Sequence, residues 1–212
     1  IFIFFKPFKK YWEQQGYEVV ITTRDLSNTI ELVEQNKWEH TLVSGHAGKN
    51  RVLKGIYFVV RVFRLWLFLR NKNIDIGISH SSFCAPMVGK LIGCRTVYLN
   101  DNEYAKGNYL AFPFATVNLL PEYLANKYTN IWFSFLLNFK FYSGIKEGIY
   151  LSQGNFLLEK NVQSLAKPSI YVRLEPDSAD YYSGDTEFLD ELLIQLSAVC
   201  DVVILPRNER QN

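Results

Sequence analysis

The sequence predicts an α/β fold built on a doubly wound parallel sheet. Short runs rich in β-branched residues alternate with longer runs of helical periodicity, from residue 7 through residue 99. Each strand-like run is followed by a polar or glycine-containing turn and then by a helix, which is the pattern of consecutive βαβ units. Such units pair their strands in parallel and place helices on both faces of the sheet.

The first expected elements are a short helix and a buried strand. The helix covers residues 7–16 and ends at Gly16, because glycine favours the position that follows a helix C-terminus. Residues 17–23 are rich in β-branched side chains and are short enough for a buried parallel strand. Asp25 or Ser27 is then expected to cap the next helix.

The alternation continues after residue 40, and a second series begins near residue 169. The expected elements are a strand at 41–43, a helix at 51–70, a strand at 74–79, a helix at 85–92, a strand at 96–99, a strand at 169–173, a helix at 186–198 and a strand at 202–205. The last three form the start of a second βαβ series. We therefore predict two domains, residues 1–162 and residues 163–212, and expect the chain to be a piece of a longer protein.

Composition excludes two broad classes. The chain has 212 residues, 48% of them hydrophobic, which is too apolar for disorder. It has 23 Lys and Arg residues and 21 Asp and Glu residues. The resulting net charge of +2 provides little positive electrostatic potential to attract nucleic acid. Cys84, Cys94 and Cys200 are widely spaced and show no zinc or disulfide pattern, so we expect a reducing, cytoplasmic location.

The helix expected at 51–70 contains the most apolar run of the chain. Residues 56–69 fall short of the roughly 20 apolar residues of a spanning helix, and Arg61 and Arg64 interrupt them. The leading interpretation is a core helix with a solvated basic stripe, and the alternative is a face that also rests on an anionic membrane surface. The aromatic run at 131–137 is expected to pack in the core.

Polar residues just beyond the strands are the candidate functional residues, because open parallel sheets bind ligands at the carboxyl ends of their strands. Together with residues at the expected hinge, they are Arg24, Gly45, His46, Gly48, Ser79, His80, Asp101, Glu103, Lys146, Glu147, Arg173 and Arg207. No P-loop, G-x-G-x-x-G, H-E-x-x-H or C-x-x-C motif occurs. The sequence therefore gives no support to an ordinary dinucleotide enzyme, an ATPase or a zinc hydrolase, and no metal site is predicted.

His46 is the preferred general base. It lies between small residues ahead of a helix, and an imidazole with an ordinary pKa near 6.5 suits proton transfer at neutral pH. The alternative is a turn in which His46 only hydrogen-bonds locally. Asp101 and Glu103 are the next candidates, since paired carboxylates hold a metal, serve as acid and base or bind sugar hydroxyls. The sequence shows no third metal ligand beside them, and the alternative is a solvated turn. His80 either binds substrate or belongs to a helix-capping segment.

Arg173 and Arg207 each follow a strand of the second series. The guanidinium fork suits phosphate or carboxylate, so these two residues are candidates for binding an anionic substrate group. Salt bridges to Glu175 or Glu209 are the competing explanation.

A set of short motifs occurs in one order along the chain. They are Phe4-Phe5-Lys6-Pro7, Gly16-Tyr17-Glu18-Val19, Thr22-Thr23-Arg24-Asp25, Gly45-His46-Ala47-Gly48, Asp101-Asn102-Glu103, Phe112-Pro113-Phe114-Ala115, Tyr142-Ser143-Gly144-Ile145-Lys146-Glu147, Tyr150-Leu151, Tyr171-Val172-Arg173 and Leu205-Pro206-Arg207. Together they resemble domain-of-unknown-function family 354, which is similar to GT-B glycosyltransferases and to UDP-N-acetylglucosamine 2-epimerases. The resemblance runs from about Phe4 to Arg207.

This resemblance implies a GT-B-like architecture of two Rossmann-like domains. Residues 1–162 would be the acceptor-side domain without its first strand, and residues 163–212 the truncated start of the domain that binds the nucleotide-sugar. By the same resemblance, His46, Asp101 and Glu103 lie on the acceptor side, whereas Arg173 and Arg207 face the donor diphosphate.

The function that follows from the resemblance is transfer of a sugar in cell-surface polysaccharide synthesis. The expected partners are a UDP-sugar donor and a glycan or lipid-linked acceptor, with the nucleotide-sugar as substrate and no cofactor. The protein would be cytoplasmic, with possible peripheral contact at the inner face of the cell membrane. The alternatives are an enzyme like the UDP-N-acetylglucosamine 2-epimerases and a sugar- or nucleotide-binding module without turnover.

Overall fold

The computed structural model describes residues 2–25, 29–44, 51–131, 134–153, 168–174 and 187–206. The chain divides into two compact units, Ile1–Asn155 and Phe156–Asn212, and each is described by itself. The division falls within residues 154–167, outside the described ranges, so the predicted domain boundary at 162/163 stays a prediction.

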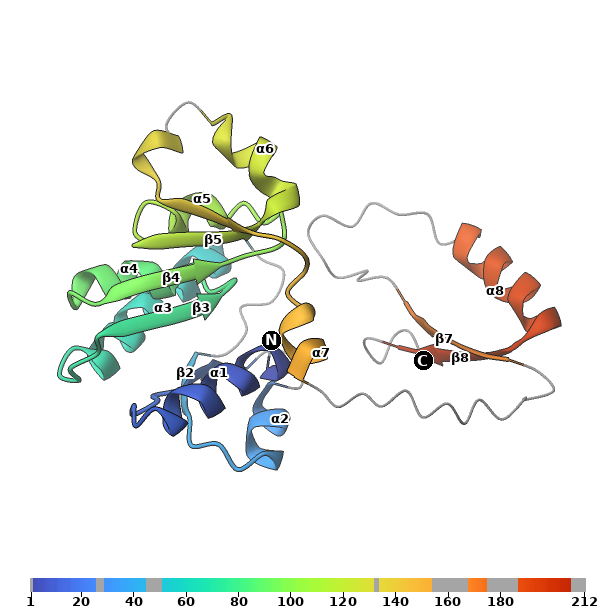
Figure 1. The fold of residues 1–212 in the computed structure, drawn as a ribbon, viewed down its shortest axis with the longest axis horizontal. Coiled ribbons are helices and arrows are strands. Elements are labelled where there is room, and N and C mark those ends of the chain that lie inside the picture. The colour runs from blue at the N-terminus through green and yellow to red at the C-terminus, as the bar shows by residue number, and fades with distance from the viewer. Residues whose placement is uncertain are drawn as a thin grey trace. The chain divides into compact units, whose positions relative to one another are not determined.

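A four-stranded parallel sheet forms the centre of the first unit (Figure 1). Its strands are β3 (Ile76–His80), β4 (Arg95–Leu99), β5 (Val117–Pro121) and β6 (Phe139–Tyr142), in that spatial order. All three strand pairs are parallel, so the four carboxyl ends lie at one edge of the sheet. The predicted α/β class with a parallel sheet is confirmed, and the sheet with its flanking helices is consistent with a Rossmann-like fold.

A second parallel pair precedes this sheet along the chain. It consists of β1 (Thr22–Arg24) and β2 (Thr41–Ser44), with α1 (Phe2–Gln14) before it and α2 (Thr29–Gln35) between its strands. The strand expected at 17–23 was predicted too long, because pairing begins only where Thr22 meets Thr41.

The first helix begins earlier than predicted, at Phe2 instead of Pro7. Phe2 and Phe4 are buried on its inner face, so the apolar opening run is part of the helix.

Helix α3 (Arg51–Leu69) packs against β2 and against α4 (Cys84–Leu91), which in turn covers β3 and β4. Leu65 is buried with Cys84 and Val88 in a shared cluster. The opposite side of α3 exposes apolar residues, among them Val59 and Phe63, so the expectation of a core helix holds for one face only. Among the described residues, no helix combines the length and the apolar character needed to cross a membrane.

The region after β4 contains elements that the sequence analysis did not predict. They are α5 (Asn108–Ala111), β5, the 3-10 turn η1 (Glu122–Leu124), α6 (Ala125–Thr129), the 3-10 turn η2 (Ser134–Leu136), β6 and α7 (Gly148–Gln153). The run at 131–137 is only partly in the core. Ile131 and Leu137 pack against buried residues, whereas Phe135 and Leu136 are exposed in η2.

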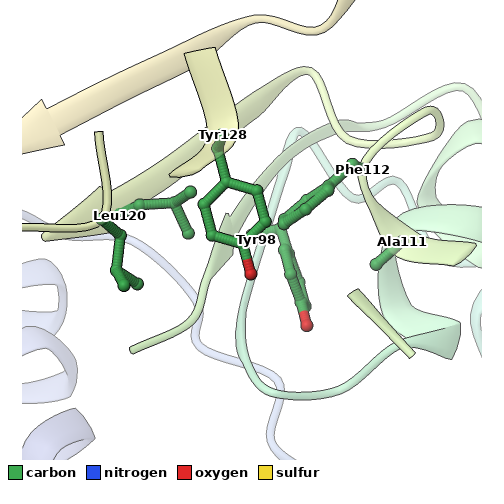
Figure 2. Packing of buried hydrophobic residues seen from close by; sticks show 6 residues of the cluster. Tyr98, Ala111, Phe112, Leu120 and Tyr128 are labelled. Carbon is green, nitrogen blue, oxygen red and sulfur yellow. The ribbon is translucent and has the colours of Figure 1, made fainter. Parts of the chain in front are cut away.

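Aromatic rings form the core between β4, β5 and the helices after them (Figure 2). Phe112 packs edge-on against Tyr98 at a centroid distance of 5.9 Å and against Tyr128 at 5.2 Å. Leu120 of β5 and Ala111 belong to the same cluster, and these five residues are at most 1% exposed. The core therefore lies directly beneath the carboxyl end of β4.

The second unit contains one parallel pair and one helix. Strand β7 (Ser169–Arg173) pairs in register with β8 (Asp201–Leu205), and α8 (Glu187–Val199) connects them. This strand, helix and strand agree with the order that the sequence predicts.

Two glycines inside helices provide a matched test of the packing. A Cβ at Gly89 of α4 would overlap Cγ2 of the buried Thr96 on β4, whereas a Cβ at Gly55 of α3 would meet nothing within 4 Å. We expect Gly55→Ala to raise the free energy of unfolding by about 0.5–1 kcal/mol, because alanine favours the helix. Gly89→Ala should lower it by about 1 kcal/mol despite that gain, because the added methyl overpacks the core.

Urea unfolding of the two variants measures this difference. The double variant Gly89→Ala with Thr96→Ser removes Cγ2 but keeps the hydroxyl that accepts from the Thr116 amide, so it should restore most of the loss. A Gly89→Ala protein as stable as Gly55→Ala would contradict the close packing of α4 on β4.

Candidate functional site

The carboxyl edge of the four-stranded sheet brings together side chains from the ends of three strands or the loops that follow them. His80 is the last residue of β3, Asp101 follows β4, and Lys146 follows β6. These three residues, with the neighbouring Glu147, form a charged cluster that we call the Asp101 cluster.

The Asp101 carboxylate lies between His80 and Lys146. Its Oδ1 is 3.5 Å from His80 Nε2, and its Oδ2 accepts a hydrogen bond from Lys146 Nζ. The same Lys146 ammonium is 3.8 Å from Glu147 Oε1. The His80 side chain is 5% exposed, whereas those of Asp101, Lys146 and Glu147 are 23%, 28% and 38% exposed. A ligand at this edge would therefore meet the two carboxylates and the ammonium, with His80 beneath them.

The contacts of His80 are compatible with a proton on Nε2. Asn100 Nδ2 donates to Ser81 Oγ at 3.0 Å, and Ser81 Oγ is 3.0 Å from His80 Nδ1. The Ser81 hydroxyl can therefore donate to Nδ1, which leaves the ring proton on Nε2, facing Asp101. Ser81 has a φ of 57°, in the left-handed region that is uncommon outside glycine. This backbone turn places its hydroxyl beside the imidazole of the preceding residue.

Burial lowers the pKa of His80 to about 4, although the negative charge of Asp101 acts in the opposite direction. The Phe4 ring, with its centroid 5.4 Å from the imidazole, contributes to the apolar surroundings. His80 is therefore neutral at neutral pH, with Nδ1 beside the Ser81 hydroxyl and Nε2 facing the Asp101 carboxylate.

A buried amide network holds the loop that carries Asp101. Asn100 Oδ1 accepts hydrogen bonds from the Asn102 amide at 2.7 Å and from Asn108 Nδ2 at 3.2 Å. Asn108 Nδ2 also lies 3.0 Å from the Asn102 carbonyl, and its Oδ1 accepts from the Tyr98 hydroxyl at 2.7 Å. These bonds hold residues 100 and 102, on both sides of Asp101. The backbone that carries the carboxylate is therefore held in place.

Two tyrosines border the same cluster. The Tyr123 hydroxyl donates to the Asp101 carbonyl oxygen at 3.0 Å. Burial, together with the charge of Asp101, raises the pKa of Tyr142 to about 12, so its phenol stays protonated. The sequence analysis included neither tyrosine nor Asn108 among the candidates, because each lies well away from a strand end that it recognised.

The other predicted residues lie in several places. Ser79 is buried on β3 next to His80, and Arg24 ends β1. Glu103 is in the loop after β4, and its carbonyl oxygen accepts from Lys127 Nζ at 3.1 Å. Arg173 ends β7 of the second unit. Gly45, His46, Gly48 and Arg207 lie outside the described residues, so their predicted roles stay predictions.

The Asp101 cluster contains oxygen and nitrogen atoms that can bind a polar ligand. Within the described ranges, no three His, Cys, Asp or Glu side chains are placed to hold a metal ion. All three cysteines are buried and free. The arrangement can remove a proton from, or donate a hydrogen bond to, a polar ligand, and Lys146 can pair with an anionic group.

The chain is similar to other known proteins. An uncharacterized protein of Methanocaldococcus jannaschii is 26% identical over 213 residues, which cover 95% of this chain and 61% of that protein. The chain thus spans about three-fifths of its relative's length. No solved structure was found to match the chain. The family model described as a protein of unknown function (DUF354) matches residues 2–212. Since that match covers nearly every residue, the chain belongs to the DUF354 family.

Proposed function

We propose that the first unit is the acceptor-binding part of a GT-B-like nucleotide-sugar glycosyltransferase, and that Asp101 is its general base. The observation that supports this role is the partly exposed Asp101 carboxylate at the carboxyl edge of a parallel sheet, between His80 and Lys146. Ligands of open α/β sheets bind at this edge. A fixed carboxylate there can accept a proton from a sugar hydroxyl.

The proposed transfer follows from these groups. An acceptor hydroxyl attacks the anomeric carbon of the donor, and the bond from that carbon to the diphosphate oxygen breaks with its electron pair on the diphosphate. The hydroxyl proton passes to the Asp101 carboxylate, which His80 holds in position through Nε2. Lys146 balances negative charge as it develops on the diphosphate, because its ammonium lies at the same edge.

The proposed donor is a UDP-sugar, and the proposed acceptor is a glycan or a lipid-linked glycan of cell-surface polysaccharide synthesis. The exposed apolar face of α3, which includes Val59 and Phe63 beside the exposed Arg64, is compatible with an enzyme that meets a lipid-linked acceptor at a membrane surface. We place the enzyme in the cytoplasm, with peripheral contact at the inner face of the membrane.

A second candidate is a UDP-N-acetylglucosamine 2-epimerase-like reaction. It is favoured by the presence of two carboxylates, Asp101 and Glu147, on either side of one Lys146 ammonium. Two such groups could remove and return a proton at the sugar C2 position. Transfer requires an added acceptor and epimerisation does not, so the dependence of product formation on acceptor separates the two reactions.

Isothermal titration of the full-length protein with UDP and with UDP-N-acetylglucosamine tests the nucleotide-sugar proposal. We expect saturable binding of both, with ADP as a matched nucleotide that binds at least about tenfold more weakly, since a nucleotide site discriminates bases through its polar groups. The same titration on residues 1–212 shows how much of that site this part of the chain provides. Absence of UDP and UDP-sugar binding by the full-length protein would overturn the proposal.

A further inference from the structure

We infer that helix α3 docks the protein on a membrane of anionic phospholipid, through an exposed row of apolar side chains with arginines at its border. The row, which we call the α3 stripe, consists of Ile56, Val59, Val60, Phe63 and Leu67. The inference deepens the proposed function and rests on it in one respect, because it assigns the peripheral membrane contact proposed there to one helix and one lipid chemistry. The observations that carry it do not depend on which reaction the Asp101 cluster performs.

The α3 stripe lies on the side of the helix opposite to the one that packs in the core. Its members follow one another at positions i, i+3, i+4, i+7 and i+11, so they share one side of the helix, and each is between 39% and 65% exposed. On the other side, Phe58, Val62, Leu65 and Leu69 pack into the buried cluster that contains Val88. The packed side therefore accounts for the attachment of α3 to the first unit and leaves the stripe uncovered within the described part of the chain. Contiguous exposed apolar surface of this kind marks a site of contact with a protein or a membrane.

The charge around the stripe indicates which of these partners covers it. Residues 40–100 contain nine Lys and Arg and one acidic residue, Asp75, although the whole chain has 23 basic and 21 acidic residues. Neither α3 nor α4, which packs against it, contains Asp or Glu. Arg64 follows Phe63 at the border of the stripe, Arg70 lies one turn beyond Leu67, and both arginines are exposed. The positive charge of the protein is thus concentrated in the segment that carries the apolar row.

This combination fits an anionic lipid surface better than the other partners. A helix that lies on a membrane inserts an apolar face at the acyl boundary and pairs its basic residues with anionic headgroups. A second copy of the chain would bring the same basic border against itself in a symmetric contact, which is electrostatically unfavourable. Nucleic acid offers phosphates to the arginines but no apolar layer for the stripe. The charge and the apolar row together therefore assign the face to anionic phospholipid.

The C-terminal end of α3 carries the residue types that favour a membrane interface. The guanidinium of Arg70 lies 5.1 Å from the centroid of the Trp66 ring, and the ammonium of Lys72 lies 5.0 Å from that of the Phe68 ring. Long basic side chains and tryptophan combine an apolar body with a polar end, and both types are favoured at the level of the headgroups. Because the other side of α3 packs against β2 and α4, the helix would lie along the surface of the bilayer.

The structure also corrects which basic residues border the exposed face. The sequence analysis treated Arg61 and Arg64 as one solvated stripe, and this was wrong for Arg61. Arg61 is half-buried, and its Nη2 donates to Ser82 Oγ at 2.9 Å in the turn after β3. Arg64 is exposed. Arg64 is therefore the residue of this pair that can meet a lipid headgroup.

Vesicles made of equal parts phosphatidylglycerol and phosphatidylcholine are the probe for this surface. We expect the full-length protein to sediment with them, and to bind vesicles of pure phosphatidylcholine at least about tenfold more weakly, because basic residues near the bilayer are attracted by anionic headgroups. Added salt should weaken the binding to the anionic vesicles, since it screens this attraction.

The apolar contribution is tested with two phenylalanines. Phe63→Ser should weaken binding to the anionic vesicles at least about fivefold, because it removes apolar surface that the membrane would bury. Phe135→Ser is the matched control, since Phe135 is 79% exposed in η2 and lies outside α3; it should change the binding less than twofold. Leu67→Ser is a second variant of the stripe, for use if Phe63→Ser does not fold.

The charge contribution is tested in the same way. Arg64→Gln should weaken binding to the anionic vesicles about fivefold, because it removes one basic residue at the membrane surface. Its control is Lys140→Gln, since Lys140 is exposed on β6 at the edge of the sheet that is farthest from β3; this variant should change the binding less than twofold.

Four results would overturn the inference. They are the absence of binding to anionic vesicles, equal binding to neutral and anionic vesicles, equal effects of Phe63→Ser and Phe135→Ser, and a dimer of the wild type that Phe63→Ser converts to a monomer. A large loss of stability in Phe63→Ser of the full-length protein would also overturn it, because the stripe would then be packed against the rest of that protein.

These results are distinguishable from a failure of the nucleotide-sugar proposal. Vesicle binding through the α3 stripe by a full-length protein that does not bind UDP would keep the membrane surface and remove only the proposed glycosyltransferase. Binding of UDP without binding to anionic vesicles would remove the membrane surface alone.

Discussion

Asp101→Asn should lower the turnover of the full-length enzyme with a UDP-sugar and its acceptor by at least about 100-fold. An amide of the same shape cannot accept the hydroxyl proton, and general base catalysis contributes about 10² to 10⁴ in rate. UDP binding should change less than twofold, because the carboxylate is proposed to act on the acceptor. Rates of UDP release, measured beside isothermal titration with UDP, separate these two effects.

Asp75→Asn is the matched control for this substitution. Asp75 immediately precedes β3, at the opposite edge of the sheet from Asp101, and is exposed, so its loss should leave turnover unchanged. Asp101→Asn should also fold normally, since a partly exposed ion pair such as Asp101 with Lys146 contributes about 0–1 kcal/mol. Turnover within threefold of wild type in Asp101→Asn would remove the base assignment.

The parts of the fold that could be predicted are those with continuous apolar strands. Residues 74–79 and 96–99 were predicted as strands because β-branched residues cluster there between polar turns, and the structure places β3 at Ile76–His80 and β4 at Arg95–Leu99. Strand β5 was missed because Asn118 interrupts its apolar run. The structure buries Asn118, whose Nδ2 donates to the Phe112 carbonyl at 3.1 Å, so a tertiary hydrogen bond makes a polar residue acceptable inside the sheet.

The sequence could predict which residues belong to the candidate site, but not which of them contact one another. The rule that ligands bind at the carboxyl ends of strands identified His80 and Asp101, whereas Lys146 was a candidate only as a residue of the expected hinge. It did not indicate that Asp101 would lie between the other two, because Lys146 reaches this edge through β6, which the sequence pattern did not reveal. Arg61 was misplaced for a similar reason. Helical periodicity predicts on which face of the helix a residue lies, but not which loop packs against that face. For Arg61, that loop contains Ser82.

Lowering the pH from 7 to 4 should reduce the free energy of unfolding through His80, by up to about 3 kcal/mol. The folded pKa of about 4 lies below the ordinary 6.5, mainly because the ring is buried. Between these two values the unfolded chain binds a proton that the folded protein does not bind. The contribution of His80 to stability is therefore complete above about pH 6.5 and is lost as the pH falls toward 4.

The variant His80→Gln separates this contribution from other acid-dependent groups. Glutamine does not titrate, so the stability difference between wild type and variant in urea unfolding should shrink by about 2 kcal/mol between pH 7 and pH 4.5. Proton NMR gives a direct check, because the chain has three histidines and the variant identifies the His80 signal by its disappearance. A His80 signal that titrates with a midpoint above pH 6 would show that the ring is charged beside Asp101. His80 would then be a proton donor to that carboxylate, and the proposed role of Asp101 as the base would need to change with it.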